Sequence, residues 1–495
     1  MTPDALLAEA RAALNAGNFA AAERSARQLL VLAPSAEAHD VLGNALRAQD
    51  RLEEALASAD AALKLKPGNV VAQHGRALTL SRLGRYADSL ATFDSLVARG
   101  VAAAPLWLNR GVALLGLTRV EEAEAAFADG VKRWPQDQGL QNALASTRWM
   151  RGEGATFARD YEDAVARYPD ALFLRLGCAD LLRRADQREQ SEAVLREGLR
   201  RAPDDPQIQG ALGVVLDEMD RTAEALPLLT RAVAGLPQLP FMRGNLISAL
   251  LRLSRAQEAL RQIEPLRAAQ PYNGDWIAYQ AMAWRQLSDA RYHWLCDYEL
   301  MVRGYDLEAP PGYATMAEFN AALRETLDRM HVLETHPLDQ SLRHGSQTTR
   351  SLLTIDEPVI KQYLQALEAP IRAYIATMQD PDHPWSGRKS ERFKLAGCWS
   401  VKLRAKGYHI NHLHPEGWIS SAYYVSLPEV TRSGESQEGW IKFGEPRWPT
   451  PGCTIEKVVQ PKEGRLVLFP SYMWHGTIPF SAGERMTAPF DVVPA

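Results

Sequence analysis

The chain of 495 residues contains only four cysteines, and they are widely separated: Cys178, Cys296, Cys398 and Cys453. None forms a CxxC pair, so the sequence indicates neither a zinc ribbon nor a disulfide framework. A run of about 20 apolar residues, which a membrane helix requires, is also missing. The first residues, MTPDALLAEARAALNAG, carry acids where a signal peptide has its apolar stretch. From these absences we expect reduced thiols and a cytoplasmic protein.

The sequence also lacks a large excess of charge of either sign. It has 56 lysines and arginines against 60 aspartates and glutamates, which gives a formal net charge of -4. This balance gives no reason to expect nucleic acid or an anionic membrane as a partner. The hydrophobic content of 46% and the charged content of 23% are ordinary for a globular protein. A chain of this length is longer than one core usually needs, so we expect two or more domains.

Prolines recur at a fixed interval through the first half of the chain. Except for one double interval, they are 34 residues apart: Pro67, Pro135, Pro169, Pro203, Pro237 and Pro271. Small residues keep the same phase in two sets, which are Gly43, Ala77, Gly111, Gly177 and Gly213, and Ala55, Ala123, Ala225 and Ala259. This period is typical of tetratricopeptide repeats, in which each unit is a pair of antiparallel helices and proline follows the second helix.

The periodicity predicts an α-solenoid over residues 1–300. We expect about eight repeats, followed by a degenerate ninth helix pair around Trp276 to Leu300. Stacked repeats form a superhelix with a concave groove. The groove favours a peptide or protein partner, and the alternative is that the repeats only support the C-terminal domain.

The helical pattern breaks at Pro310-Pro311-Gly312. Residues 301–394 are expected to form a helical bridge and the start of a second domain, with helices over 316–330 and 357–378. From 395 onward short β-rich runs alternate with Gly, Pro and charged residues. The strands are expected at 395–404, 418–427, 440–443, 454–459, 465–469, 476–480 and 485–493. Seven short strands predict a jelly roll, or double-stranded β-helix, over 395–495, and therefore a multidomain α plus β protein.

Three histidines near the C-terminus form a candidate metal site. His412 and His414 are two residues apart, so both would face one side of a strand, and His475 follows 61 residues later. Two sets of ligands are open. Either His412, His414 and His475 bind the metal, or Glu416 replaces His412 and gives two histidines and a carboxylate.

Short motifs also follow a fixed order from about residue 300. They are Pro337–Arg343 with Gly345, Gln347-Thr348, Cys398–Ser400, His412–Pro415, Trp418–Val425, Gly464–Ser471, Trp474–Thr477 and Glu484-Arg485. In this order they resemble the 2-oxoglutarate/Fe(II) oxygenase domain that often follows tetratricopeptide repeats in bacterial proteins.

The resemblance implies Fe(II) and 2-oxoglutarate as cofactors and molecular oxygen as a cosubstrate. Its His-x-His-Pro pattern favours the three-histidine ligand set. It also implies that Arg485 binds the far carboxylate of 2-oxoglutarate, because a guanidinium can grip a carboxylate through two parallel hydrogen bonds. Tyr423 and Tyr424 lie on opposite faces of their strand, so only one of them can reach the cosubstrate.

Arg343, Gln347 and Trp418 are candidate residues of the substrate entrance. The two polar residues have an alternative role in satisfying loop backbone, and the tryptophan has one in the core. The favoured hypothesis is a dioxygenase that hydroxylates a peptide or protein recruited by the solenoid. Two other hypotheses stay open: an interaction scaffold with a degenerate oxygenase barrel, and a cupin-like three-histidine metalloenzyme of other chemistry.

Overall fold

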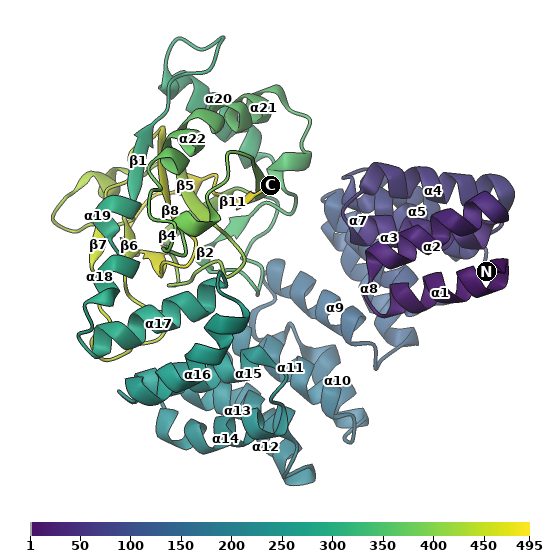
Figure 1. Ribbon diagram of the computed structural model, residues 1–495, viewed down its shortest axis with the longest axis horizontal. Coiled ribbons are helices and arrows are strands. Elements are labelled where there is room, and N and C mark those ends of the chain that lie inside the picture. The colour runs from purple at the N-terminus through teal and green to yellow at the C-terminus, as the bar shows by residue number, and fades with distance from the viewer. Residues whose placement is uncertain (1) are drawn as a thin grey trace. The chain divides into compact units, whose positions relative to one another are not determined.

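The computed structural model describes residues 2–495 and has a helical part followed by a part that combines helices and antiparallel sheets (Figure 1). Contacts along the chain divide it into two compact units, Met1–Thr147 and Arg148–Ala495. Within the described residues no helix combines the length and the apolar character that crossing a membrane requires.

The first unit consists of antiparallel helix pairs. Its helices are α1 (Pro3–Asn15), α2 (Phe19–Leu32), α3 (Ala36–Ala48), α4 (Leu52–Leu65), α5 (Val70–Arg82), α6 (Tyr86–Ala98), α7 (Ala104–Gly116), α8 (Val120–Arg133) and most of α9 (Gln138–Met150). Polar side chains begin several of them. Ser35 accepts a hydrogen bond from the backbone N–H of Ala38, and Asn69 accepts from those of Val71 and Ala72.

Small residues allow the two helices of a pair to approach closely. A Cβ at Gly111 of α7 would lie 2.2 Å from Cε1 of Phe127 on α8, which is a clash. The ring of Phe127 fills this space and is fully buried. The repeat phase read from the sequence therefore has a direct packing cause.

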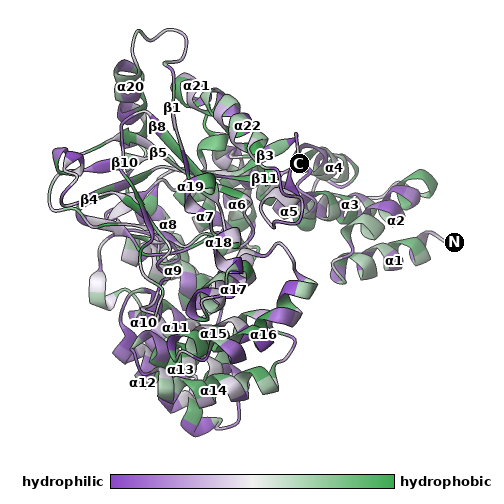
Figure 2. Cartoon of the chain, turned by 60° about the vertical axis from the view of Figure 1, so that its left-hand side comes forward, coloured by the Kyte–Doolittle hydropathy of each residue, from purple (hydrophilic) through white to green (hydrophobic). Residues whose placement is uncertain are grey.

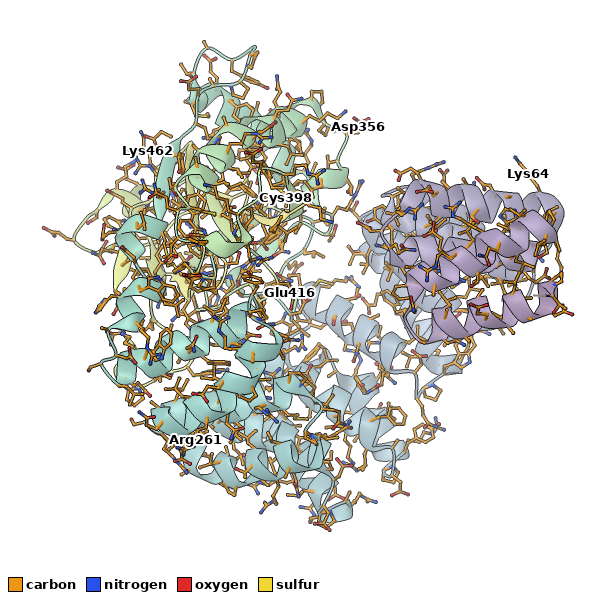
Figure 3. All side chains as sticks on the ribbon, in the orientation of Figure 1. Lys64, Arg261, Asp356, Cys398, Glu416 and Lys462 are labelled. Carbon is orange, nitrogen blue, oxygen red and sulfur yellow. The ribbon has the colours of Figure 1, made fainter. Side chains whose placement is uncertain are left out.

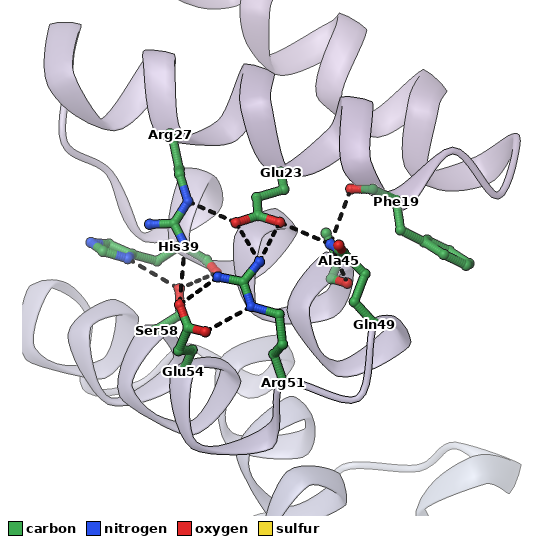
Figure 4. Close-up of polar contacts among 9 residues, drawn as sticks. All are labelled: Phe19, Glu23, Arg27, His39, Ala45, Gln49, Arg51, Glu54 and Ser58. Atoms are coloured by element: carbon green, nitrogen blue, oxygen red, sulfur yellow. Dashed lines mark hydrogen bonds and ion pairs between the residues drawn. The ribbon is translucent and has the colours of Figure 1, made fainter. Parts of the chain in front are cut away.

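Charged side chains add contacts between successive helices of the first unit (Figure 4). Arg51 donates to both carboxylate oxygens of Glu23 at 2.8 Å and forms an ion pair with Glu54 at 2.6 Å. Gln49 donates to Glu23 at 2.9 Å. Because these groups lie close to solvent, each pair stabilises the fold by no more than about 1 kcal/mol. The buried small and apolar residues provide most of the packing.

The second unit begins with the remaining helix pairs. These helices are α10 (Arg159–Arg167), α11 (Leu172–Arg184), α12 (Arg188–Arg201), α13 (Pro206–Glu218), α14 (Thr222–Gly235), α15 (Pro240–Arg252), α16 (Ala256–Ala269), α17 (Gly274–Gln286), α18 (Arg291–Leu295) and α19 (Tyr298–Met301). Both hydrophilic and hydrophobic colours run along the solenoid helices, as expected of amphipathic helices (Figure 2).

The positions of the periodic prolines confirm the predicted role of proline. Each lies two residues after the last residue of a second helix: Pro67 after α4, Pro135 after α8, Pro169 after α10, Pro203 after α12, Pro237 after α14 and Pro271 after α16. Proline has no backbone N–H and cannot continue a helix, so it ends each pair at the same phase.

The sheets of the second unit are antiparallel. Their strands are β1 (Arg303–Asp306), β2 (Leu342–Gln347), β3 (Phe393–Cys398), β4 (Val401–His409), β5 (Ile419–Ser426), β6 (Ile441–Phe443), β7 (Lys457–Val459), β8 (Arg465–Pro470), β9 (His475–Thr477), β10 (Arg485–Thr487) and β11 (Phe490–Pro494). One sheet has the order β1-β8-β5-β10-β4-β2, with β11 joining β5 and β3, and the other has the order β7-β6-β9. The jelly roll stays a prediction.

Three long elements expected from the sequence are each divided in two. The expected strand 395–404 is two strands, because β3 pairs with β11 whereas β4 pairs with β2 and β10. The expected strand 485–493 breaks between β10 and β11 at Pro489, which cannot donate to a ladder. The expected helix 357–378 divides at Leu367, because Pro370 cannot donate to the carbonyl of Ala366.

Helices from residues 301–394, where the sequence predicts a helical bridge, cover the larger sheet (Figure 1). They are α20 (Met316–Asp328), α21 (Pro358–Ala366) and α22 (Glu368–Ala376). Tyr423 of β5 donates from its hydroxyl to Asn320 Oδ1 of α20 at 2.6 Å. Tyr363 of α21 and Phe319 of α20 are fully buried in the same core. The apolar layer between helices and sheet leaves the opposite face of β5 free to form a site.

Candidate functional site

Three histidine rings converge in the second unit. His412 and His414 lie in the connection between β4 and β5, and His475 begins β9. The two predicted neighbours therefore do not stand in a regular strand. The backbones of His412 and His475 pair through two hydrogen bonds of 2.9 and 3.0 Å. One ring nitrogen from each histidine lies within 4.8 Å of the others, close enough for one metal ion.

The hydrogen bond that Nδ1 of each ring makes fixes the tautomer of that histidine. Nδ1 of His412 lies 2.8 Å from the carbonyl oxygen of Ile410, and Nδ1 of His475 lies 2.9 Å from that of Met473. Nδ1 of His414 lies 2.6 Å from Oδ2 of Asp491. Carbonyl and carboxylate oxygens only accept, so each Nδ1 donates a proton and each Nε2 keeps its lone pair. Three Nε2 lone pairs thus lie in one place, where the Ser341 hydroxyl is 3.3 Å from Nε2 of His412.

Burial keeps the rings of His412 and His475 neutral. It lowers the pKa of His412 to about 3, and the neighbouring His414 acts in the same direction. Burial also lowers the pKa of His475 well below its ordinary value. Because a metal binds neutral imidazole, these two rings do not need to lose a proton before they bind a cation near neutral pH.

Asp491 supports the His414 ring from behind and was not foreseen from the sequence. Ser420 of β5 donates to its second oxygen, Oδ1, at 2.7 Å. Carboxylates that accept from a ligand histidine orient the ring and raise its basicity. Asp491 is separated from His414 by 77 positions and stands in β11, so no local pattern announces it.

Glu416, the alternative ligand, lies outside the group of three histidines. Its side chain is exposed, and its Oε1 accepts a long hydrogen bond of 3.5 Å from Asn273. Asn273 caps helix α17, so Glu416 lies where the β-sheet part meets the solenoid helices (Figure 3). In this position its carboxylate points toward the repeats.

Arg485 of β10 lies in the same cavity as the three histidines. This cavity has a volume of about 740 Å³. The arginine is only 2% exposed, and within residues 2–495 no carboxylate pairs with it and its Nε has no hydrogen-bond partner. Burial lowers the pKa of Arg485, against the effect of Tyr424. An unpaired buried cation is unfavourable, so the cavity fits an anionic ligand.

The two neighbouring tyrosines of β5 separate as the alternation predicts. The ring of Tyr424 lies under Arg485, with 5.1 Å between its centroid and Cζ of the arginine. The Tyr424 hydroxyl is buried beside the guanidinium, which opposes the rise of its pKa on burial, and no carbonyl or carboxylate of residues 2–495 accepts its proton. Tyr423 points the other way, toward α20. Tyr424 is therefore the tyrosine on the side of the cavity.

The three candidate entrance residues lie in different surroundings. Arg343 and Gln347 of β2 both line the cavity. Arg343 is 8% exposed and forms an ion pair of 3.5 Å with Asp186, in the loop between α11 and α12. Trp418 lies in the hydrophobic core instead, where its indole N–H donates to the carbonyl of Trp385 at 2.8 Å.

Solenoid residues reach the cavity, which the sequence did not reveal. Arg183 and Arg184 of α11 line it, together with Arg447 from the loop after β6. Positions more than two hundred residues apart meet here only through the tertiary structure. The repeat helices of the second unit are thus part of the site's wall.

Comparison with known proteins agrees with both parts of the chain. A family described as "Putative 2OG-Fe(II) oxygenase" matches residues 397–491. The tetratricopeptide repeat family matches 7–70, 74–138, 108–171 and 176–240. The Hsp70-Hsp90 organizing protein of Triticum aestivum is 33% identical over 106 residues, which are 21% of this chain and 18% of that protein.

Solved structures of repeat proteins are also similar to part of the chain. A tetratricopeptide repeat protein from Parabacteroides merdae is 18% identical, with a TM-score of 0.35, and the match covers 50% of this chain and 98% of that one. A TPR protein of Thermus thermophilus is 23% identical, with a TM-score of 0.27, covering 44% and 100%. The chain thus combines tetratricopeptide repeats with a C-terminal domain of the 2-oxoglutarate/Fe(II) oxygenase kind.

Proposed function

We propose that the protein is a dioxygenase that uses Fe(II) and 2-oxoglutarate to hydroxylate a peptide or protein segment. The observation that carries the proposal is the convergence of three Nε2 lone pairs beside a buried, unpaired arginine in one cavity. An Fe(II) ion and an acidic cosubstrate are the two ligands that such a pair of features fits.

The proposed metal ligands are His412, His414 and His475, each through Nε2. Asp491 holds the His414 ring in the productive tautomer, and backbone carbonyls do the same for the other two rings. When bound, the iron and 2-oxoglutarate supply the activation of oxygen and the oxidation of a C–H bond.

Arg485 and Tyr424 are the proposed cosubstrate ligands. The guanidinium orients the far carboxylate of 2-oxoglutarate through two parallel hydrogen bonds, which a buried arginine without a carboxylate partner is free to make. The Tyr424 hydroxyl donates its unpaired proton to the same ligand. Binding of the cosubstrate gives both groups a hydrogen-bond partner. Because the surroundings have a low dielectric constant, these hydrogen bonds increase the affinity.

The repeats support a polypeptide as the substrate. Tetratricopeptide solenoids present extended concave surfaces that suit peptides. Arg183 and Arg184 of the repeats line the metal cavity, so a segment held by these helices would have its side chains beside the histidines. Molecular oxygen is the second substrate of the proposed reaction.

The direct test is succinate release by the full-length protein. We expect release that depends on both Fe(II) and 2-oxoglutarate, and loss of bound metal in His412→Ala, His414→Ala and His475→Ala. Glu416→Ala is the matched control and keeps the metal. Retained metal in all three histidine variants would contradict the site, and metal binding without any succinate release would favour the scaffold alternative.

One observation also fits a different chemistry. The ligand group contains three histidines and no carboxylate, which is a ligand set that cupin-like barrel enzymes use with other metals and no 2-oxoglutarate. The two possibilities differ in Arg485. If the purified protein binds 2-oxoglutarate only when the arginine is intact, the oxygenase proposal holds. If 2-oxoglutarate does not bind at all, the cupin-like alternative replaces it.

A further inference from the structure

A second cavity shares a wall with the metal cavity. It has a volume of about 560 Å³ and lies in the concave side of the repeats, between α11, α13, α15 and α17 and the loop 446–450. Arg183, Arg184 and Arg447 line both cavities. Trp474 lines the groove, and its neighbour His475 lines the metal cavity. A ligand in the groove therefore meets the metal site at the three shared arginines.

Much of the groove wall is apolar. Its apolar side chains include Leu176, Val214, Phe241, Met242, Tyr279 and Trp474. Phe241 is 57% exposed, so its ring is open to contact with a ligand. This part of the groove suits an apolar side chain of a bound segment.

The boundary between the two cavities has an excess of positive charge. Five arginines lie there against three carboxylates. The arginines are Arg183, Arg184, Arg188, Arg343 and Arg447, and the carboxylates are Asp180, Asp186 and Glu218. Four of the arginines share these three acids as ion-pair partners, at distances from 2.6 to 3.5 Å. The group therefore has an excess of two positive charges, and one arginine pairs with none of the three acids.

Arg447 is that arginine. Within the described part of the chain its guanidinium forms no ion pair and no hydrogen bond, and only stacks over Trp448, 5.1 Å from the ring centroid. Burial in the cavity wall lowers the pKa of Arg447. The carboxylate of Glu218 acts in the opposite direction. The positive charges of Arg183, Arg343 and Arg188 lower the pKa further. An incoming carboxylate would relieve this repulsion.

The loop that carries Arg447 is held in place from both sides. Asn411, next to the ligand His412, donates to Glu445 Oε2 at 2.9 Å and to the carbonyl of Pro446 at 3.0 Å. On the other side Gln286 of α17 donates to the carbonyl of Pro451 at 2.9 Å. Arg447 is therefore a positioned cation beside the metal ligands, not a mobile surface group.

We propose that the substrate is an acidic polypeptide segment, with an apolar side chain in the solenoid groove and an Asp or Glu side chain on Arg447, next to the residue that is oxidised. This proposal rests on the proposed function and names its substrate class. A nucleic acid is the less favoured ligand, because the apolar groove offers no continuous row of phosphate contacts.

Peptide selection tests the proposal. The full-length protein, loaded with Fe(II) and 2-oxoglutarate without oxygen so that nothing is consumed, selects from a degenerate library of displayed 12-residue peptides. We expect enrichment of Asp or Glu at a fixed distance from an apolar residue. Arg447→Gln loses this enrichment, and the affinity of a selected peptide falls on the order of tenfold to a hundredfold.

A matched control removes an arginine away from both cavities. Arg261 lies on the outer side of α16, is exposed and lines neither cavity (Figure 3). Arg261→Gln keeps the enrichment and the affinity of the wild type for 2-oxoglutarate.

Three outcomes overturn the proposal. They are the absence of acidic enrichment, enrichment that survives Arg447→Gln, and binding of a single-stranded oligonucleotide in preference to every peptide. Because binding is measured without turnover, failed selection together with normal succinate release refutes the substrate class alone. Successful selection without succinate release refutes the proposed reaction alone.

Discussion

His414 and Asp491 are joined by a hydrogen bond of 2.6 Å between Nδ1 and Oδ2, although they are 77 positions apart in the sequence. Ser420 holds the other carboxylate oxygen, and its own hydroxyl lies 2.9 Å from that of Ser471. The ring orientation of a proposed metal ligand thus depends on three side chains from three different elements. A substitution of Asp491 should therefore change the metal affinity, although Asp491 is not itself a proposed ligand.

We therefore predict that Asp491→Asn weakens metal binding by about 10- to 100-fold. The amide accepts more weakly than a carboxylate and no longer raises the basicity of the ring. Equilibrium dialysis against Fe(II) under anaerobic conditions measures the affinity. Asp306→Asn is the control, because it removes a carboxylate that pairs with Arg465 and Lys462 at the sheet edge, away from the three histidines. Equal affinities of the two variants would refute the supporting role.

Arg485→Lys is expected to lose most of its affinity for 2-oxoglutarate while the fold and the metal are retained. Lysine keeps the charge but cannot form two parallel hydrogen bonds to a carboxylate. The lost charge-assisted bond corresponds to about 1.5–3 kcal/mol. Binding of 2-oxoglutarate to the metal-loaded protein is measured by calorimetry. An unchanged dissociation constant would show that the cosubstrate binds elsewhere.

Tyr424→Phe and Tyr423→Phe form a matched pair on one strand. We expect Tyr424→Phe to raise the KM for 2-oxoglutarate, because the removed hydroxyl is the unpaired one beside Arg485. Tyr423→Phe removes the hydrogen bond to Asn320 and costs about 1 kcal/mol of stability, with KM unchanged. The prediction fails if the two variants change KM equally or in the opposite order.

A half-buried histidine outside the metal site makes stability depend on pH. His331 lies 2.9 Å from the Ser346 hydroxyl and 3.0 Å from that of Ser400, and burial lowers its pKa to about 4, with Lys402 acting in the same direction. The unfolded chain binds a proton near pH 6.5 and the folded chain only near pH 4. The contribution of neutral His331 to the free energy of unfolding is therefore fully present above pH 6.5, and it is lost as the pH decreases toward 4.

The expected loss from this histidine between pH 7 and pH 5 is about 2 kcal/mol. His331→Gln, which does not titrate, should show a smaller loss over the same interval. Unfolding of the second unit, followed by tryptophan fluorescence in urea at the two pH values, measures it. His344→Gln, at an exposed position of β2, serves as the control and should behave like the wild type. An equal pH dependence of all three proteins would contradict the assignment.

Local sequence patterns predicted the elements whose formation depends on local causes. The repeat period, its prolines and the small residue at Gly111 are set within one helix pair, so periodicity reveals them. The strands β1 and β2 were missed because their pairing partners lie far away, β8 for one and β4 for the other. Their short polar sequences carry no alternation of their own.

The same reasoning explains which residues of the candidate site could be proposed from the sequence. His412, His414, His475 and Arg485 belong to motifs with a chemical signature, and the structure brings all four to one cavity. Asp491 and Arg447 have no such signature, because an acid in a strand and an arginine in a loop are common everywhere. Their roles arise only from what they face, which depends on the packing of distant segments.

Gly274 provides a contact between the repeats and the segment of the proposed metal ligand, His414-Pro415. The backbone N–H of Gly274, the first residue of α17, donates to the carbonyl of Pro415 at 2.8 Å. A Cβ there would lie 3.0 Å from Cα of Pro415 and 3.3 Å from the carbonyl oxygen of His414. The segment cannot yield freely, because the N–H of His414 is bonded to the carbonyl of Ser471 at 2.9 Å.

We predict that Gly274→Ala lowers the metal affinity and destabilises the second unit by about 1–3 kcal/mol, although alanine is the better helix former. The methyl group pushes the backbone at His414 and Pro415, and the metal ligand moves with it. Metal titration and urea unfolding measure the two effects. Gly434→Ala is the control, because a Cβ at Gly434 meets no atom within 4 Å. If Gly274→Ala instead stabilises the protein and keeps its metal affinity, helix α17 does not position His414 and the repeats act on the substrate alone.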